Sequence, residues 1–337
     1  MKNILKAKNI LKIFEENSFL KNLAFSLVNL PIIGSFYKKI YKTNINRKLK
    51  NFDVSNLIVS IEAMNVCNSS CIMCPYQKMT RKKEIMPMSL FFKIVDDCLI
   101  AGIRNFNLNF YNEPFLDPLI FERIKYLKSK EVNVDLFSNG SVIDENKIND
   151  IFDSGIDRIR FSVDAVKKGT YESIRRGLSF EITINNILNL IKKRNQAGLK
   201  KPRVNVVFVR QELNEGELED FLSFWKNRAD KVIISFDDNR NETSAFFKKP
   251  GRNLVAFPCR KLWTEIVVMS NGKVSLCCVD YDGQVVLGDF NKQNLKEIWE
   301  NSKFTEIRDM HLNFQSGQIS ICKNCVHSYR MNLKSWW

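Results

Sequence analysis

The sequence predicts an α/β protein, built on a parallel sheet, with a helical segment before the sheet and a small cysteine-rich unit after it. Strand-like and helix-like stretches alternate between residues 57 and 236, and a polar stretch at 237–256 then interrupts the pattern. Residues 1–50 are basic and helix-like. Because repeated β-α units give parallel strands joined by right-handed crossovers, the middle region is expected to form a partial (β/α)6 TIM-like barrel.

Each element has its own hydrophobic pattern. The predicted strands share short apolar and β-branched runs, at 57–63, 105–110, 132–137, 158–163, 203–209 and 231–236. The predicted helices share apolar residues three and four positions apart, at 90–101, 119–129, 145–154, 182–196 and 215–225. After the linker, 264–269 and 273–279 flank a Ser-Asn-Gly turn, which indicates a β-hairpin, and 295–311 has a helical pattern. We therefore expect a helical extension over 1–56, a barrel over 57–240 and a small hairpin/helix domain over 241–337.

The composition is that of a folded chain whose excess charge is local. Hydrophobic residues make up 45% and charged residues 26% of the 337 positions, which excludes a disordered chain. The formal charge is +15, but residues 1–50 hold eleven Lys or Arg against two acids, while the other 287 hold 41 against 35. This distribution gives little support to general nucleic-acid binding. It predicts that residues 1–50 bind at a membrane surface or pack on the body of the protein.

Nine cysteines are the most informative residues, because an odd number argues against a secreted disulfide framework. Cys67, Cys71 and Cys74 follow the first strand with the spacing C-x3-C-x2-C. Three thiolates on one loop can hold a [4Fe–4S] cluster and leave one of its irons open. Structural zinc is the alternative, but it prefers four ligands, and no other Cys or His is near in the sequence.

A second group of cysteines lies in the C-terminal unit. Cys259, Cys277, Cys322 and Cys325 supply four thiols, which suit zinc or a [4Fe–4S] cluster equally well on spacing alone. Cys278 is an alternative to Cys277 as the ligand. Cys98 lies in a predicted helix and is expected to be a core thiol.

These patterns resemble the radical S-adenosylmethionine (SAM) superfamily over about 57–236, and the SPASM/twitch extension of that superfamily in the C-terminal unit. The resemblance implies that Cys67, Cys71 and Cys74 are the catalytic cluster ligands and that Cys259, Cys277, Cys322 and Cys325 bind an auxiliary [4Fe–4S] cluster. It also implies SAM contacts at Tyr76, Asn112, Glu113, Ser138, Asn139, Ser162, Asp164 and Arg175. Most of these follow the carboxyl ends of successive strands, where barrel enzymes build their active sites. One departure is that Tyr111 and Asn112 stand where the family usually has two glycines.

The resemblance implies a radical SAM oxidoreductase that reductively cleaves SAM to a 5′-deoxyadenosyl radical, takes a hydrogen atom from its substrate and oxidises that substrate with help from the auxiliary cluster. We expect a sugar, aminocyclitol or glycan-precursor substrate. The alternatives are a peptide-modifying enzyme, an RNA-modifying enzyme and a non-enzymatic zinc-binding scaffold. Candidate substrate contacts are Arg210, Gln211, Asp237, Asp238 and Arg240.

The expected partners are a small-molecule or peptide substrate and an electron donor of the reductase, flavodoxin or ferredoxin type. A nucleic-acid partner is not expected. The expected location is the cytoplasm, at the inner face of the membrane if residues 1–50 bind lipid.

Overall fold

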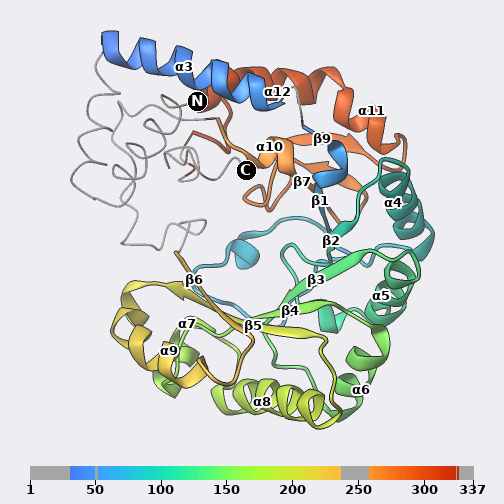
Figure 1. The fold of residues 1–337 in the computed structure, drawn as a ribbon, viewed down its shortest axis with the longest axis vertical. Coiled ribbons are helices and arrows are strands. Elements are labelled where there is room, and N and C mark those ends of the chain that lie inside the picture. The colour runs from blue at the N-terminus through green and yellow to red at the C-terminus, as the bar shows by residue number, and fades with distance from the viewer. Residues whose placement is uncertain (1–30, 50–51, 237–257, 324, 326–337) are drawn as a thin grey trace, which may run out of the picture.

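The computed structural model describes residues 31–49, 52–236, 258–323 and 325, which form a curved sheet with helices on its outer side (Figure 1). The nine strands are ordered β6-β5-β4-β3-β2-β1-β7-β8-β9. The pairs from β6 to β7 are parallel, and β8 is antiparallel to both of its neighbours. Because β6 and β9 are separate edges of this sheet within the described residues, the barrel is partial, as predicted.

The strands and helices alternate through the barrel. The strands are β1 (Ile58–Ile61), β2 (Asn105–Asn107), β3 (Asn133–Ser138), β4 (Arg158–Ser162), β5 (Arg203–Arg210), β6 (Lys231–Phe236), β7 (Glu265–Val268), β8 (Lys273–Ser275) and β9 (Val286–Asp289). The α-helices are α3 (Pro31–Leu49), α4 (Met88–Ile100), α5 (Ile120–Ser129), α6 (Glu145–Ser154), α7 (Lys168–Ile174), α8 (Phe180–Gln196), α9 (Leu218–Trp225), α10 (Lys261–Thr264), α11 (Leu295–Glu300) and α12 (Ser302–Leu312). Short 3-10 turns lie at Val54–Asn56, Pro75–Lys78, Pro114–Leu116, Glu212–Glu217 and Ser316–Gln318.

The six predicted barrel strands and the five predicted helices are confirmed, and their ends differ from the prediction by no more than three residues. The single helix predicted over 295–311 is wrong, because α11 ends and α12 begins at Asn301. The Asn301 side chain accepts a hydrogen bond from Phe304 N at 2.8 Å, so it caps a new helix instead of continuing the old one. The sequence analysis also did not predict β9.

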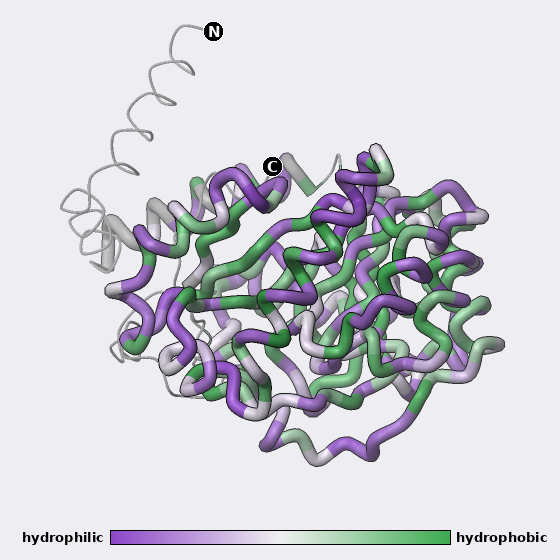
Figure 2. The backbone as a smooth tube through the Cα atoms, turned by 90° about the horizontal axis from the view of Figure 1, so that it is seen from below, coloured by the Kyte–Doolittle hydropathy of each residue, from purple (hydrophilic) through white to green (hydrophobic). Residues whose placement is uncertain are grey.

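The core lies between the outer face of the sheet and the helices. Burial alternates along β1 and β4, so that Val59, Ile61, Ile159 and Phe161 are fully buried against the helices. Each such side chain contributes roughly 1.5–3 kcal/mol by leaving water. In Figure 2 the hydrophobic stretches lie mostly within the body, whereas hydrophilic stretches are frequent at its outline. The inner face of the sheet is left for polar side chains.

The C-terminal unit continues the same sheet. β7 pairs in parallel with β1, with Ile58 opposite Glu265 and Ile61 opposite Val268. The predicted hairpin is confirmed: β7 pairs with β8, and Gly272 in the turn has a φ of +82°. The proposed domain limits at 56/57 and 240/241 stay predictions, because the sheet is continuous from β6 to β9.

The described part of the N-terminal extension is α3, which lies beside α12 (Figure 1). Lys42 Nζ donates to Asn313 Oδ1 at 2.6 Å, Lys38 Nζ lies 5.6 Å from the centre of the Phe314 ring, and Ile45 is buried. Helix α3 therefore packs on the body, and residues 1–30 lie outside the described residues. Among the described helices, none has the length and apolar character needed to cross a membrane.

Candidate active site

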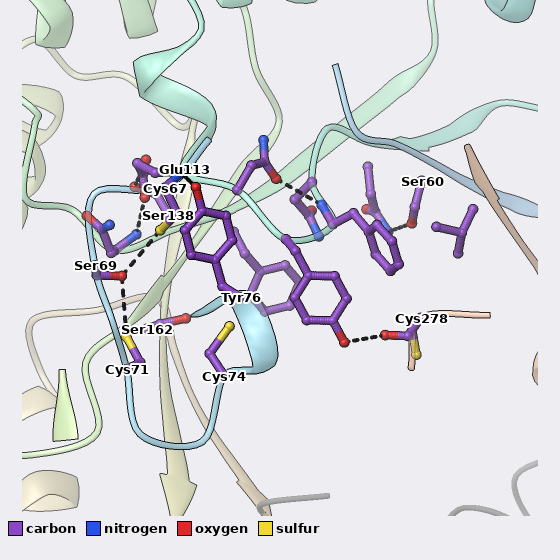
Figure 3. Close-up of a pocket in the computed structure, with 18 of the residues that line it drawn as sticks. Ser60, Cys67, Ser69, Cys71, Cys74, Tyr76, Glu113, Ser138, Ser162 and Cys278 are labelled. Carbon is purple, nitrogen blue, oxygen red and sulfur yellow. Dashed lines mark hydrogen bonds between the residues drawn. The ribbon is translucent and has the colours of Figure 1, made fainter. Parts of the chain in front are cut away.

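The loop after β1 places three cysteines together, and a serine lies between two of their thiols. Ser69 Oγ lies 3.2 Å from the Cys67 sulfur and 3.4 Å from the Cys71 sulfur. Arg175 Nη1 donates to the Cys71 sulfur at 3.5 Å, and Cys74 N donates to the Cys71 carbonyl at 3.0 Å. The three cysteines of the first motif therefore lie together on one side of a cavity (Figure 3).

The end of α7 and the residues that follow it fix the shape of this loop. Ser70 N donates to the Arg176 carbonyl at 2.8 Å, and Ile72 N donates to the Ile174 carbonyl at 3.0 Å. The hydroxyl of Tyr76 accepts a hydrogen bond from the amide of the first cysteine at 2.9 Å. The sulfurs are therefore placed by backbone contacts with a distant part of the chain.

The cavity has a volume of about 470 Å³ and lies at the carboxyl ends of the barrel strands. Its lining includes the three cysteines and most of the predicted SAM contacts, namely Tyr76, Asn112, Glu113, Ser138, Asn139, Ser162 and Arg175. These residues follow different strands or lie at their ends, so the parallel sheet brings together groups that are far apart in the sequence.

Glu113 is the most buried carboxyl group of this lining, with 1% of the residue exposed. It accepts hydrogen bonds from Ser138 Oγ at 2.8 Å and from Asn139 N at 2.6 Å. Burial raises the pKa of Glu113 to about 7, although these donors oppose the rise. A buried carboxyl group held in this way is suited to receive a cationic ligand group.

Asp164 is not among the residues that line this cavity, although the family resemblance implied a SAM contact there. Its carboxylate forms an ion pair with Arg175 and accepts a hydrogen bond from Val209 N at 2.7 Å. Its φ of +66° is uncommon for a residue other than glycine. Asp164 therefore lies behind Arg175 and holds that side chain toward the cavity.

The candidate substrate contacts from the end of β5 also lie outside the cavity lining. Arg210 forms an ion pair with Glu215, and Gln211 N donates to Asn214 Oδ1 at 2.7 Å. Asp237, Asp238 and Arg240 lie outside the described residues.

The opposite wall of the cavity comes from the C-terminal unit, and sequence reasoning named only Cys278 among its members, as an alternative cluster ligand. Lys261, Glu265 and Cys278 line the cavity, and Lys261 Nζ lies 3.0 Å and 3.1 Å from the two carboxylate oxygens of Glu265. Tyr111 Oη donates to the Cys278 carbonyl at 2.9 Å, so it links the two walls. Figure 3 shows Cys278 across the cavity from the first three cysteines. The only sequence signal for Lys261 was its place two residues after Cys259.

Two members of the second cysteine group contact a buried histidine. His311 Nδ1 accepts a hydrogen bond from Cys259 N at 3.2 Å, and His311 Nε2 lies 3.5 Å from the Cys322 sulfur. Burial lowers the pKa of His311 to about 4, so the ring is neutral near pH 7. A neutral ring that accepts at Nδ1 carries its proton on Nε2, which is directed at the Cys322 sulfur. Sequence reasoning noted His311 only as distant from the first cysteine motif.

Cys277 and Cys278 have different surroundings. The Cys277 sulfur accepts a hydrogen bond from Val279 N at 3.4 Å, and the side chain packs against the core. Burial, together with the negative charges of Cys278, Cys259 and Cys325, raises the pKa of Cys277. Cys278 faces the cavity instead. The thiols of the second group are therefore close enough to influence one another's ionisation.

Both cysteine groups suit a cationic metal centre. Burial raises the pKa of Cys74 to about 11 and that of Cys259 to about 12, so these thiols need a nearby positive centre to ionise near pH 7. Among the described residues, no group of three or more His, Cys, Asp or Glu side chains is placed to surround a single metal ion. A cubane contacts each thiolate through a different iron, which requires wider spacing than one ion does.

Two buried polar atoms near the cavity lack partners within the described part of the chain, namely Asn109 Oδ1 and Arg175 Nε. Both residues line the cavity. An unpaired buried polar atom is costly, so these atoms are available to a polar ligand such as the amino-acid end of SAM. The residues present therefore fit both a three-cysteine cluster and SAM.

Comparison with known protein families agrees with this geometry. Residues 61–224 match the radical SAM superfamily, and residues 259–326 match SPASM, an iron–sulfur cluster-binding domain. The chain belongs to the radical SAM superfamily and carries a C-terminal SPASM domain. These domains imply a [4Fe–4S] cluster, SAM and an auxiliary cluster as the cofactors.

Two curated relatives differ in the extent of their similarity. GTP 3′,8-cyclase from Clostridium botulinum is 26% identical over 167 residues, which is 48% of this chain and 50% of that protein, so the chain spans about half its length. The S-adenosyl-L-methionine-dependent 2-deoxy-scyllo-inosamine dehydrogenase from Niallia circulans is 21% identical over 278 residues, which is 80% of this chain and 92% of that protein.

A similar solved structure is that of Streptococcus suis SuiB bound to the precursor peptide SuiA. It has a TM-score of 0.61 and 16% identity, and the match covers 78% of this chain and 69% of that chain. At this identity the similarity is one of fold.

Proposed function

We propose that this protein is a radical SAM oxidoreductase in which Cys67, Cys71 and Cys74 hold the cluster that binds SAM. The observation that carries the proposal is the shared cavity, because its lining combines these three thiols, the predicted SAM contacts and a wall from the SPASM domain. When bound, the cluster and SAM supply a 5′-deoxyadenosyl radical that takes a hydrogen atom from the substrate.

The lining residues have distinct roles in this proposal. Glu113 binds the SAM amino group, because its buried carboxylate is held in place by Ser138 and Asn139. Arg175, which Asp164 orients, binds the SAM carboxylate. Tyr76 covers the adenine, and Asn112 and Ser162 supply the remaining polar contacts. Together these residues orient SAM and exclude water from the reacting atoms.

We further propose that Cys259, Cys277, Cys322 and Cys325 hold the auxiliary cluster, which accepts an electron from the substrate. Cys277 is preferred to Cys278 because it packs against the core, whereas Cys278 faces the substrate cavity. Four thiolates leave no open iron, which favours electron transfer over substrate binding at this cluster. Lys261 and Glu265, which line the cavity, contact the substrate.

A sugar or aminocyclitol is the favoured substrate. The cavity of about 470 Å³ would also receive the cluster and SAM, so the space that remains beside them suits a small molecule. The similarity to an aminocyclitol dehydrogenase over 80% of this chain points the same way. A peptide substrate remains the alternative, as for the peptide-bound SuiB. An electron donor of the flavodoxin, ferredoxin or reductase type and a cytoplasmic location complete the proposal.

The proposal is tested by anaerobic reconstitution of the purified protein with iron and sulfide. Two cubanes correspond to about eight irons per chain, and SAM with dithionite should release 5′-deoxyadenosine. Cys71→Ala should reduce the iron content to about four and abolish this release. Cys98→Ala is the matched control, because Cys98 is a fully buried thiol in α4, away from both cysteine groups. Release by C71A at the rate of C98A would contradict the assignment.

A further inference from the structure

A second cavity of about 630 Å³ lies at the opposite end of the barrel, where β2, β3, β4 and β5 begin. Asn107 lines both cavities, so the second cavity adjoins the first. No motif in the sequence assigned a role to it. The second cavity lies on the inner side of the same sheet, at the opposite end of the strands from the proposed site of hydrogen abstraction.

The two cavities are stacked along the barrel strands. On β4, Arg160 lines the second cavity and Ser162 lines the first, and on β3 the corresponding residues are Asp135 and Phe137. Residues two positions apart on a strand face the same side and differ in height by about 7 Å. The Arg160 guanidinium carbon lies 5.0 Å from the centre of the Phe137 ring, so the cavities lie about one layer of side chains apart on this side, and they meet where Asn107 lines both. A single ligand with a ring and a short extension can reach from one to the other.

The charge of the second cavity is unbalanced. Four cationic side chains line it, namely Arg158, Arg160, Lys201 and Arg203, against two carboxylates, so the lining carries a formal net charge of +2. Barrel interiors are ordinarily filled by branched apolar side chains, which makes this polar layer unusual.

The two carboxylates do not neutralise all four of these cations. Asp135 binds both Arg158 and Arg160, at 2.8 Å and 2.7 Å, so two guanidiniums share one carboxylate. Asp157 is bound by Lys201 at 2.5 Å and by Lys128, from outside the cavity lining, at 2.7 Å. Arg203 is exposed at the mouth of the cavity, and its side chain has no ion pair or hydrogen bond within the described residues. One guanidinium charge at Asp135 and the whole charge of Arg203 therefore remain available to a ligand.

We propose that this second cavity binds a phosphate ester group of the substrate, while the ring that loses hydrogen occupies the first cavity. This inference rests on the proposed function and narrows its substrate class to phosphorylated sugar-like molecules. A phosphate dianion matches the surplus of two positive charges, and the planar guanidinium fork matches phosphate oxygens in pairs. Arg160 and Arg203 are the specificity-determining residues.

Isothermal titration calorimetry of the anaerobically reconstituted protein tests the inference, with inorganic phosphate and glucose 6-phosphate as probes. Both should bind at one saturable site, and glucose 6-phosphate should bind more tightly and displace phosphate. Arg203→Gln and Arg160→Gln should weaken phosphate binding about tenfold or more, as expected for a lost charged hydrogen bond. Asp135→Asn should tighten it several-fold, because it removes a carboxylate that competes for the same guanidiniums.

The opposite signs expected for D135N and the arginine variants distinguish ligand binding from general damage to the fold. Arg228→Gln is the control, since Arg228 is exposed beyond α9 and should leave binding unchanged. No saturable binding, or weakening by D135N as large as that by R203Q, would overturn the inference. Equal affinities for phosphate and glucose 6-phosphate would show that the cavity binds a free anion, and would overturn the proposal that one ligand occupies both cavities. Failure of the proposed function would appear separately, as absent 5′-deoxyadenosine release with phosphate binding intact.

Discussion

A buried ion pair joins the barrel to the SPASM domain and offers a quantitative test of how the cavity is held together. Arg81 donates through both terminal nitrogens to the Glu62 carboxylate, at 2.6 Å and 2.9 Å, and through Nε to the Tyr281 carbonyl at 2.8 Å. Glu62 has no exposed surface, and it also accepts from Tyr111 N at 3.2 Å and Ser270 N at 3.3 Å. One carboxylate therefore binds both walls of the site.

Arg81→Met should lower the free energy of unfolding by about 3–5 kcal/mol, because it leaves a buried carboxylate without its counter-ion. Burial already raises the pKa of Glu62, despite the opposing effect of Arg81. A carboxyl group whose pKa is higher in the folded than in the unfolded state stabilises the fold when it is protonated. Its contribution to the free energy of unfolding is therefore present at low pH and is lost as the pH rises through the folded-state pKa. Removing Arg81 should raise this pKa further. The destabilisation should therefore be smaller at pH 5 than at pH 8.

The assay is urea unfolding under anaerobic conditions, followed by tryptophan fluorescence at both pH values. Lys82→Met is the matched control, because Lys82 is exposed and its replacement should change stability by no more than about 0.5 kcal/mol. The double variant E62L/R81M should regain part of the loss, because the apolar pair removes the unpaired buried charge but leaves the Tyr111 and Ser270 amides without their acceptor. Equal midpoints for R81M and K82M, or no recovery in the double variant, would refute the reasoning.

Three further substitutions test the candidate site. Glu113→Gln should weaken SAM binding about tenfold, measured by equilibrium dialysis, because it removes the charge proposed to bind the SAM amino group; unchanged affinity would contradict that role. Cys325→Ala should preserve 5′-deoxyadenosine release but stop substrate oxidation and reduce the iron content to about four per chain. An unchanged product yield would remove the electron-transfer role. His311→Ala should shift the electron paramagnetic resonance signal of the auxiliary cluster, whereas His311→Gln should partly restore it, because His311 contacts Cys259 and Cys322. Identical spectra for both variants and the wild type would show that this histidine does not tune the cluster.

Local patterns in the sequence accounted for the elements whose burial is regular. β1 and β4 have alternating side-chain burial, and their positions were predicted to within two residues. The break between α11 and α12 was missed because the apolar spacing continues across Asn301, where a single extended residue with a side-chain cap separates the helices. A short polar side chain that caps a helix can separate two helices without changing the spacing of the apolar residues around it.

The parts of the site that come from a local sequence motif were predictable, whereas the parts that depend on the pairing of distant strands were not. Cys67, Cys71 and Cys74 lie within eight positions, so their spacing alone indicated a shared ligand. Lys261 and Glu265 reach the cavity only because β7 pairs with β1, about 200 residues away along the chain. Such a contact has no signature in a single sequence, because it is determined by the register of the folded sheet.

The pairing of β1 with β7 has a consequence for electron transfer between the proposed centres. β1 leads directly into the first cysteine motif, and β7 begins six residues after Cys259. Four residue pairs of this parallel ladder hold the two segments in register. A thermal motion that slid one segment along the other would have to break several backbone hydrogen bonds together. The tunnelling distance between the proposed donor and acceptor should therefore vary little with thermal motion.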